Sequence, residues 1–142
     1  MKTALLVLFV LAPAISMAGD RRLALPPLSL VARALVHQKM ANHSKQMTEL
    51  VWAVVLLDYR RTVDLAKALA LEPRIARPTS GDATELNAAL APRFFDLQDQ
   101  PRAKAQQLEV AAQMRDPSGV ARAYGGVAET CVACHDAYLS QR

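Results

Sequence analysis

Residues 120–138, VARAYGGVAETCVACHDAY, decide the fold. Apolar, aromatic and cysteine side chains recur in this stretch at steps of three and four residues, which places them along one side of an α-helix of 3.6 residues per turn. The stretch follows the turn-forming residues 116–119 and lies close to the end of a 142-residue chain. It therefore predicts a last helix whose inner face carries both cysteines of the chain. The residues on that face are Val120, Tyr124, Val127, Cys131, Cys134 and Tyr138.

Three further helices are expected before this segment. Ala, Leu, Gln, Lys, Arg and Glu dominate the chain, and apolar runs at three and four residue spacing favour helices over strands. The first helix would begin at an N-cap, Ser29, and continue to Val54, and the second would end before Pro73. The third would begin near Pro92, and Pro101 would end, start or kink part of it. The predicted fold is all-α, an antiparallel four-helix bundle whose core can hold a cofactor.

The amino terminus predicts export. Lys2, an apolar run over 4–11 and the small-residue exit Ser16-Met17-Ala18 have the layout of a secretory signal peptide. We expect residues 1–18 to be removed and residues 19–142 to form a single domain in the periplasm. The apolar run is too short to cross a hydrocarbon core of about 30 Å, so no stable membrane insertion is expected.

The pentapeptide CVACH that begins at Cys131 indicates covalent haem. Two thiols three residues apart, Cys131 and Cys134, can each add to one vinyl group of a porphyrin, and the adjacent His135 can then ligate the iron. One covalently attached haem c is the expected cofactor. The alternatives are a redox dithiol, which normally opens a helix after a strand, and a zinc site completed by His37 and His43, which lack the usual spacing.

The motif, together with YGGV at 124–127, resembles the carboxyl-terminal sequence of the cytochrome c′ group of class II c-type cytochromes. The stretch 33–48 is similar to the first helix of the Met-ligated, low-spin relatives of that group. The resemblance implies a four-helix bundle with the sixth iron position facing the first helix, and it makes Met40 the expected sixth ligand, with His37 as the alternative. In cytochrome c′ an arginine commonly follows the tyrosine of the motif, whereas Leu139 stands here.

A stripe on the first helix and three aromatic residues are further candidates for contact with the haem. His37, Met40, Ser44 and Met47 are expected to share one stripe on the first helix, because they follow one another at three and four residue steps. The aromatic residues Trp52, Phe94 and Tyr124 are candidate wall residues for the ring.

Two classes of function follow for a haem protein of this kind. With Met40 on the iron, the chain would carry one electron between transient donor and acceptor proteins of the periplasm. With an open iron, it would bind NO or CO, and peroxidase-like turnover is a third possibility. No catalytic constellation accompanies the haem motif, so no enzyme is expected. A formal charge of +4 without blocks of like charge argues against nucleic acid as a partner, and the resemblance implies a possible homodimer.

Overall fold

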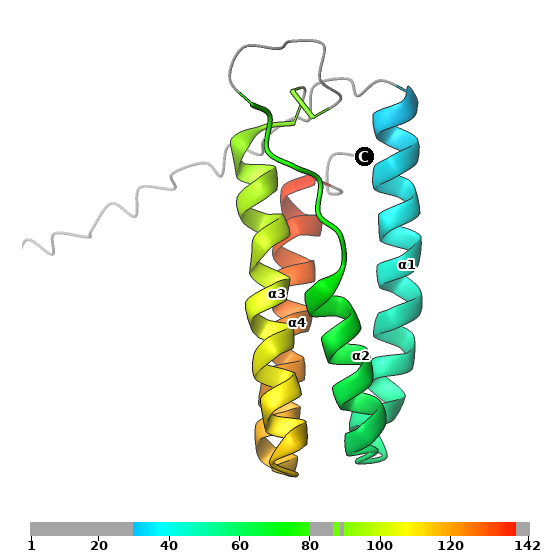
Figure 1. The fold of residues 1–142 in the computed structure, drawn as a ribbon, viewed down its shortest axis with the longest axis vertical. Helices are drawn as coiled ribbons and strands as arrows, with labels where there is room; N and C mark the ends of the chain where they lie inside the picture. The colour runs from blue at the N-terminus through cyan, green and yellow to red at the C-terminus, as the bar shows by residue number, and fades with distance from the viewer. Residues whose placement is uncertain (1–29, 80–86, 89, 139–142) are drawn as a thin grey trace, which may run out of the picture.

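The computed structural model describes residues 30–79, 87–88 and 90–138, and it confirms the all-α prediction (Figure 1). Its four helices are α1 (Leu30–Val55), α2 (Tyr59–Leu71), α3 (Pro92–Gln113) and α4 (Pro117–Tyr138). They form an antiparallel bundle in which α2 packs on α1 and α3, and α3 packs on α4. The expected signal peptide, the N-cap at Ser29 and Leu139 lie outside the described residues.

Two turns of the same kind close the lower end of the bundle in Figure 1. In the turn between α1 and α2, the Asp58 N–H donates to the Ala53 carbonyl at 2.9 Å, and Leu57 has a φ of 55°. Between α3 and α4, the Asp116 N–H donates to the Ala111 carbonyl at 3.1 Å, and Arg115 has a φ of 52°. This is the pattern of a helix that ends in a left-handed residue. Such short turns make consecutive helices antiparallel neighbours.

The ends of α2 follow from local chemistry. The Asp58 carboxylate accepts a hydrogen bond from the Arg61 N–H at 3.0 Å, so Asp58 is the N-cap of α2. At the other end Glu72 is the C-cap, and Pro73 follows at once. The helix therefore ends before Pro73, as expected, because proline cannot continue a helix there.

Pro101 lies inside α3, which continues through it. Two of the outcomes expected of this proline, an end or a start of a helix, are therefore wrong. Its ring removes one helical hydrogen bond, but Leu97 lies one turn before it with 1% of its surface exposed, and Ala105 and Leu108 beyond it are fully buried. Burial of these side chains offsets the lost bond and holds the two parts of α3 in one helix.

Most of the buried apolar residues form one cluster in the lower part of the bundle, which we call the lower core. A smaller group at the top, the upper cluster, consists of Leu90, Phe94 and Phe95. Val36, Ile75 and Tyr138 pack against the upper cluster. The lower core consists of Leu50, Ala53, Val54, Leu65, Ala66, Leu69, Ala70, Ala105, Leu108, Ala112, Val120 and Val127.

A non-helical segment, 73–79, takes the place of α2 in the upper half of the bundle. It runs upward from the end of α2 in Figure 1 and is tied to α3. The Gln98 amide accepts from the Ile75 N–H at 2.9 Å and donates to the Ile75 carbonyl at 3.0 Å. Arg74 pairs with Asp99 at 2.5 Å, and the pair lowers the pKa of that carboxyl. This half of the bundle is thus built from three helices and one pinned segment.

None of the helices in the described part of the chain is long and apolar enough to cross a membrane.

Candidate functional site

The haem motif lies in the upper half of α4. The side of α4 that faces the bundle is the one that the sequence predicts. Val120 and Val127 are buried, with 1% and 0% of their surface exposed, while Cys131, Cys134 and Tyr138 are half-buried. Because two residues three apart lie on the same side of a helix, both thiols belong to the inward side of α4. His135 follows on the exposed part of α4, in its last turn.

The electrostatics of the two thiols favour the neutral form. Burial raises the pKa of Cys134, and its neighbour Cys131 raises it further. Burial also raises the pKa of Cys131, although the Thr130 hydroxyl opposes that shift. Both thiols lie toward the carboxyl end of α4, where the helix dipole disfavours an anion. An activated redox dithiol needs a lowered thiol pKa and a place at the amino end of a helix, so these features disfavour that alternative.

The zinc site that the sequence left open is not formed by the described residues. They contain no group of three or more histidine, cysteine or carboxylate side chains placed to hold a metal ion. His37 is exposed, and the ring of His43 is bonded through Nε2 to Oε2 of Glu72.

The inward side of α1 follows alternating steps of four and three residues, as the inner face of α4 does. His37 and Ser44 are exposed, so of the expected stripe of His37, Met40, Ser44 and Met47 only the two methionines lie on the inward side of α1. An inward line beginning at Val36 instead includes Met40 and Met47. The residues along this line are Val36, Met40, His43, Met47, Leu50 and Val54, all of them buried or half-buried.

The apolar core is interrupted between the lower core and the upper cluster. Val36 of α1 and Tyr138 of α4 pack against the upper cluster, whereas Met47 and Val127 belong to or pack against the lower core. Because α1 and α4 are antiparallel, residues 37–46 of α1 and 128–137 of α4 span the same interval between the two clusters. These two helices also approach one another less than any other neighbouring pair in the bundle. The interval holds Met40 on one side and both cysteines on the other.

A family model described as Cytochrome C′ matches residues 31–139, which is most of the chain and all four helices. The chain belongs to the cytochrome c′ family. This family consists of four-helix bundles with covalently bound c-type haem, so the chain is a c-type haem protein. The curated proteins and the solved structures compared with it contain no significant match.

The residues in and beside the interval between the lower core and the upper cluster fit the haem of a cytochrome c′. Two buried polar oxygens, Oε1 of Gln46 and the hydroxyl of Tyr138, have no hydrogen-bond partner among the described residues. Native proteins rarely leave such groups unpaired, and burial also raises the pKa of the Tyr138 hydroxyl. These two oxygens, one on α1 and one on α4, are available to pair with polar groups of a bound haem. Cys131 and Cys134 would hold this haem from α4.

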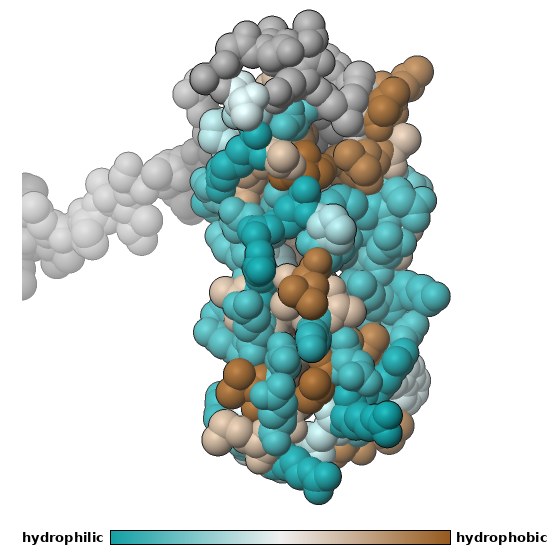
Figure 2. Space-filling view, viewed as in Figure 1, coloured by the Kyte–Doolittle hydropathy of each residue, from teal (hydrophilic) through white to brown (hydrophobic). Residues whose placement is uncertain are grey.

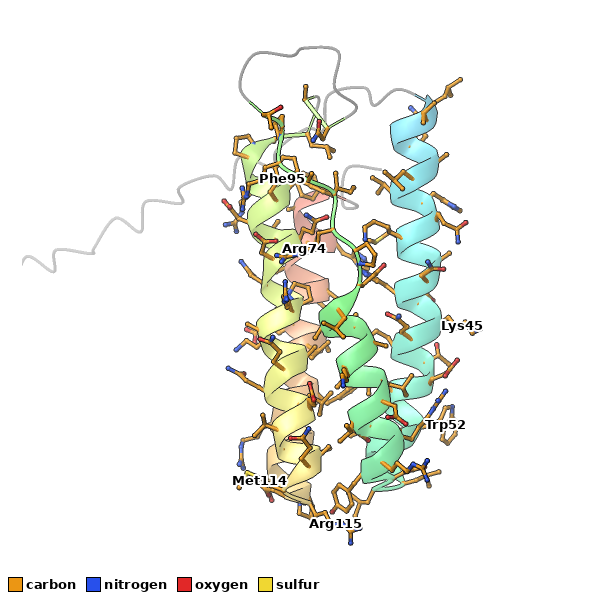
Figure 3. All side chains as sticks on the ribbon, in the orientation of Figure 1. Lys45, Trp52, Arg74, Phe95, Met114 and Arg115 are labelled. Atoms are coloured by element: carbon orange, nitrogen blue, oxygen red, sulfur yellow. The ribbon has the colours of Figure 1, made fainter. Side chains whose placement is uncertain are left out.

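The aromatic residues that the sequence suggested as walls of this cytochrome c′ site divide into three cases. Trp52 is 64% exposed and lies near the lower end of α1, away from Phe95 and the upper cluster in Figure 3, so a wall role for it was wrong. Phe94 belongs to the upper cluster, with its ring centroid 5.9 Å from that of Tyr138. Tyr124 packs against the lower core.

One polar cluster beside the site has no counterpart in the sequence-based expectations. Oε1 of Glu72 accepts from Nζ of Lys39 at 3.3 Å, and Oε2 of the same carboxylate bonds to the ring of His43. The partners are 33 and 29 residues apart, so no local pattern could predict the contact. The available signal was a lysine and a histidine four residues apart on one helix, and a carboxylate directly after the end of the next.

Proposed function

We propose that this chain carries one electron between transient periplasmic partners through one haem attached to Cys131 and Cys134, with His135 and Met40 as the axial ligands of its iron. The observation that carries the proposal is the place of Met40. It lies on the inward line of α1, in the interval between the clusters and opposite the two cysteines. His37, the alternative ligand, is exposed one position away from that line.

The other candidate ligands on α1 have different roles in the bundle. Met47 packs against the lower core, and His43 is bonded to Glu72. Met40 belongs to neither of the described clusters, although it is half-buried. A half-buried thioether is a soft axial ligand, and it favours ferrous over ferric iron.

The haem supplies a one-electron couple, and the bundle supplies a fixed environment for it. The proposed ligands come from two helices that are each more than twenty residues long. Burial between α1 and α4 favours the less charged, reduced state and so raises the reduction potential. Because the ligands are carried by helices rather than loops, little rearrangement accompanies electron transfer. We propose a carrier rather than an enzyme on this basis.

The partners would dock briefly beside the haem. Figure 2 shows apolar surface at the upper end of α1, where Val31 and Leu35 are 66% and 41% exposed. Val132, which lies between the two cysteines on α4, is 65% exposed. Scattered apolar contacts of this kind suit the small interfaces, below about 1,200 Å², of transient redox complexes. The predicted signal peptide, residues 1–18, supports a periplasmic location for these encounters.

The test is the absorption spectrum of the haem-loaded protein carrying Met40→Ala, with His37→Ala as the matched control. We expect Met40→Ala to convert a low-spin, six-coordinate haem to a high-spin one, and His37→Ala to keep the wild-type spectrum. The reverse pattern would assign the sixth position to His37. An unchanged spectrum in both variants would contradict ligation by either residue.

Binding of NO or CO is a second candidate function, and one observation favours it. Within the described part of the chain, Val36 and the contacts of Glu72 hold α1 to the rest of the bundle above the lower core. If this part of α1 moves away from α4, Met40 leaves the iron and the sixth position opens to a small gas.

A further inference from the structure

Glu72 connects the end of α2 to two residues of α1 that are one helical turn apart. Its Oε1 lies 3.3 Å from Nζ of Lys39, and its Oε2 bonds to Nε2 of His43. Nζ of Lys39 also donates to the carbonyl of Pro73. The side chains of Lys39 and Glu72 are only 15% and 16% exposed. We call these three side chains, Lys39, His43 and Glu72, the Glu72 clamp.

The clamp lies where α1 loses its helical neighbour. Below it, α1 packs on α2 through the lower core and through the ion pair of Glu49 with Arg61. Above it, α2 has ended at Leu71, and beyond the Pro73 carbonyl that Lys39 bonds, the hydrogen bonds and the ion pair of Arg74 and Ile75 go to α3. The clamp is therefore the point at which the position of the upper part of α1 is set relative to α2.

Met40 lies between the two α1 residues that the clamp holds. Lys39 precedes it by one position, and His43 follows it by three. Residues four apart lie one above the other on a helix, so binding both to one carboxylate fixes the rotation of α1 as well as its distance from α2. A rotation of α1 by one residue would turn Met40 away from the inward line.

We propose that Glu72 is a positioning residue for the sixth iron ligand: through Lys39 and His43 it fixes the rotation of α1 that directs Met40 toward the haem. The proposal rests on the proposed function, since it takes Met40 as that ligand. The clamp contains a charge-assisted hydrogen bond between partly buried groups, and such bonds are stronger than those between exposed ones. Loss of the carboxylate releases His43 and leaves Lys39 with its bond to the Pro73 carbonyl alone.

The test compares two variants that each remove one carboxylate between α1 and α2. Glu72→Ala breaks the clamp beside Met40, whereas Glu49→Ala breaks the ion pair with Arg61 lower in the bundle. The measurement is the rate of carbon monoxide binding to the reduced, haem-loaded protein, which requires Met40 to leave the iron, together with the reduction potential. We expect Glu72→Ala to bind carbon monoxide about tenfold faster and to show a lower potential. Glu49→Ala is expected to stay within about twofold of wild type, because that pair is more exposed.

A conservative variant separates positioning from general loss of stability. The amide of His43→Gln can still donate to Glu72, so this variant is expected to keep the wild-type rate and potential. His43→Ala leaves the Lys39–Glu72 pair in place, so it is expected to change both in the direction of Glu72→Ala but by less. Equal rates and potentials for Glu72→Ala and Glu49→Ala, in a protein whose spectrum does respond to Met40→Ala, would overturn the positioning role alone. A spectrum unaffected by Met40→Ala would instead overturn the proposed function, and the positioning role with it.

Discussion

Replacing Leu108 with alanine tests whether the lower core stabilises the bundle independently of the interval that would hold the haem. Leu108 lies in the middle of the lower core with none of its surface exposed. Large-to-small changes at such positions cost about 2–5 kcal/mol, because transfer free energy is lost and a cavity remains. For a domain of roughly 110 residues, 1 kcal/mol corresponds to about 4 °C in Tm. We therefore expect Leu108→Ala to lower the Tm by roughly 8–20 °C.

The assay is thermal unfolding of the haem-loaded protein, followed by circular dichroism and by the haem absorption band. Val110→Ala is the matched control, because Val110 is on the same helix but is 53% exposed, and it should change stability by less than about 0.5 kcal/mol. At 25 °C the haem spectrum of Leu108→Ala should equal that of wild type, since Leu108 is outside the interval that holds Met40. A Tm change no larger than that of Val110→Ala would refute the packing argument. A loss of the low-spin spectrum at 25 °C would refute the separation of core from site.

Four further predictions concern the cysteines and Pro101. Replacing both Cys131 and Cys134 with alanine should abolish the covalent haem mass in a denaturing mass spectrum, and haem retained in that spectrum would contradict attachment at these residues. In the haem-free protein, the raised pKa of both thiols should make alkylation at pH 7 slower than that of free cysteine, and faster as the pH rises. Because these thiols ionise more easily in the unfolded chain, the stability of the haem-free protein should fall as the pH rises above about 8.5, and a stability that rises there would be the wrong sign. Pro101→Ala should raise the Tm, because it restores a helical hydrogen bond to Leu97 and a better helix former, and a lower Tm would show that the ring packs favourably in α3.

The parts of the fold that could be predicted from the sequence depend on short-range periodicity and on caps. The inward face of α4 was correctly predicted because Val120 to Tyr138 follow a regular spacing that ends in the haem motif. Asp58 and Pro73 bound α2 by local chemistry that acts within one helical turn. Such signals can be read from neighbouring residues alone, because they do not depend on contacts with distant parts of the chain.

The errors arose where the choice between adjacent helix faces depends on distant partners. The spacing of His37 and Ser44 fits a helical stripe, but the contacts of Val36 with the upper cluster and of Leu50 with the lower core turn the inward side of α1 away from that stripe by about half a residue. Trp52 is exposed for the same reason, since it falls between the inward positions Leu50 and Val54. The Glu72 clamp joins residues about thirty positions apart, and only the packing of α1 on α2 brings them together.

The central claim is that the iron carries a protein ligand on both sides, and carbon monoxide tests it most directly. The measurement is the absorption spectrum of the reduced, haem-loaded wild-type protein with and without the gas. A six-coordinate electron carrier predicts a low-spin spectrum that saturating carbon monoxide leaves unchanged on the time scale of mixing. A high-spin spectrum that shifts at once with carbon monoxide would contradict ligation by Met40 and would make gas binding the function of this site.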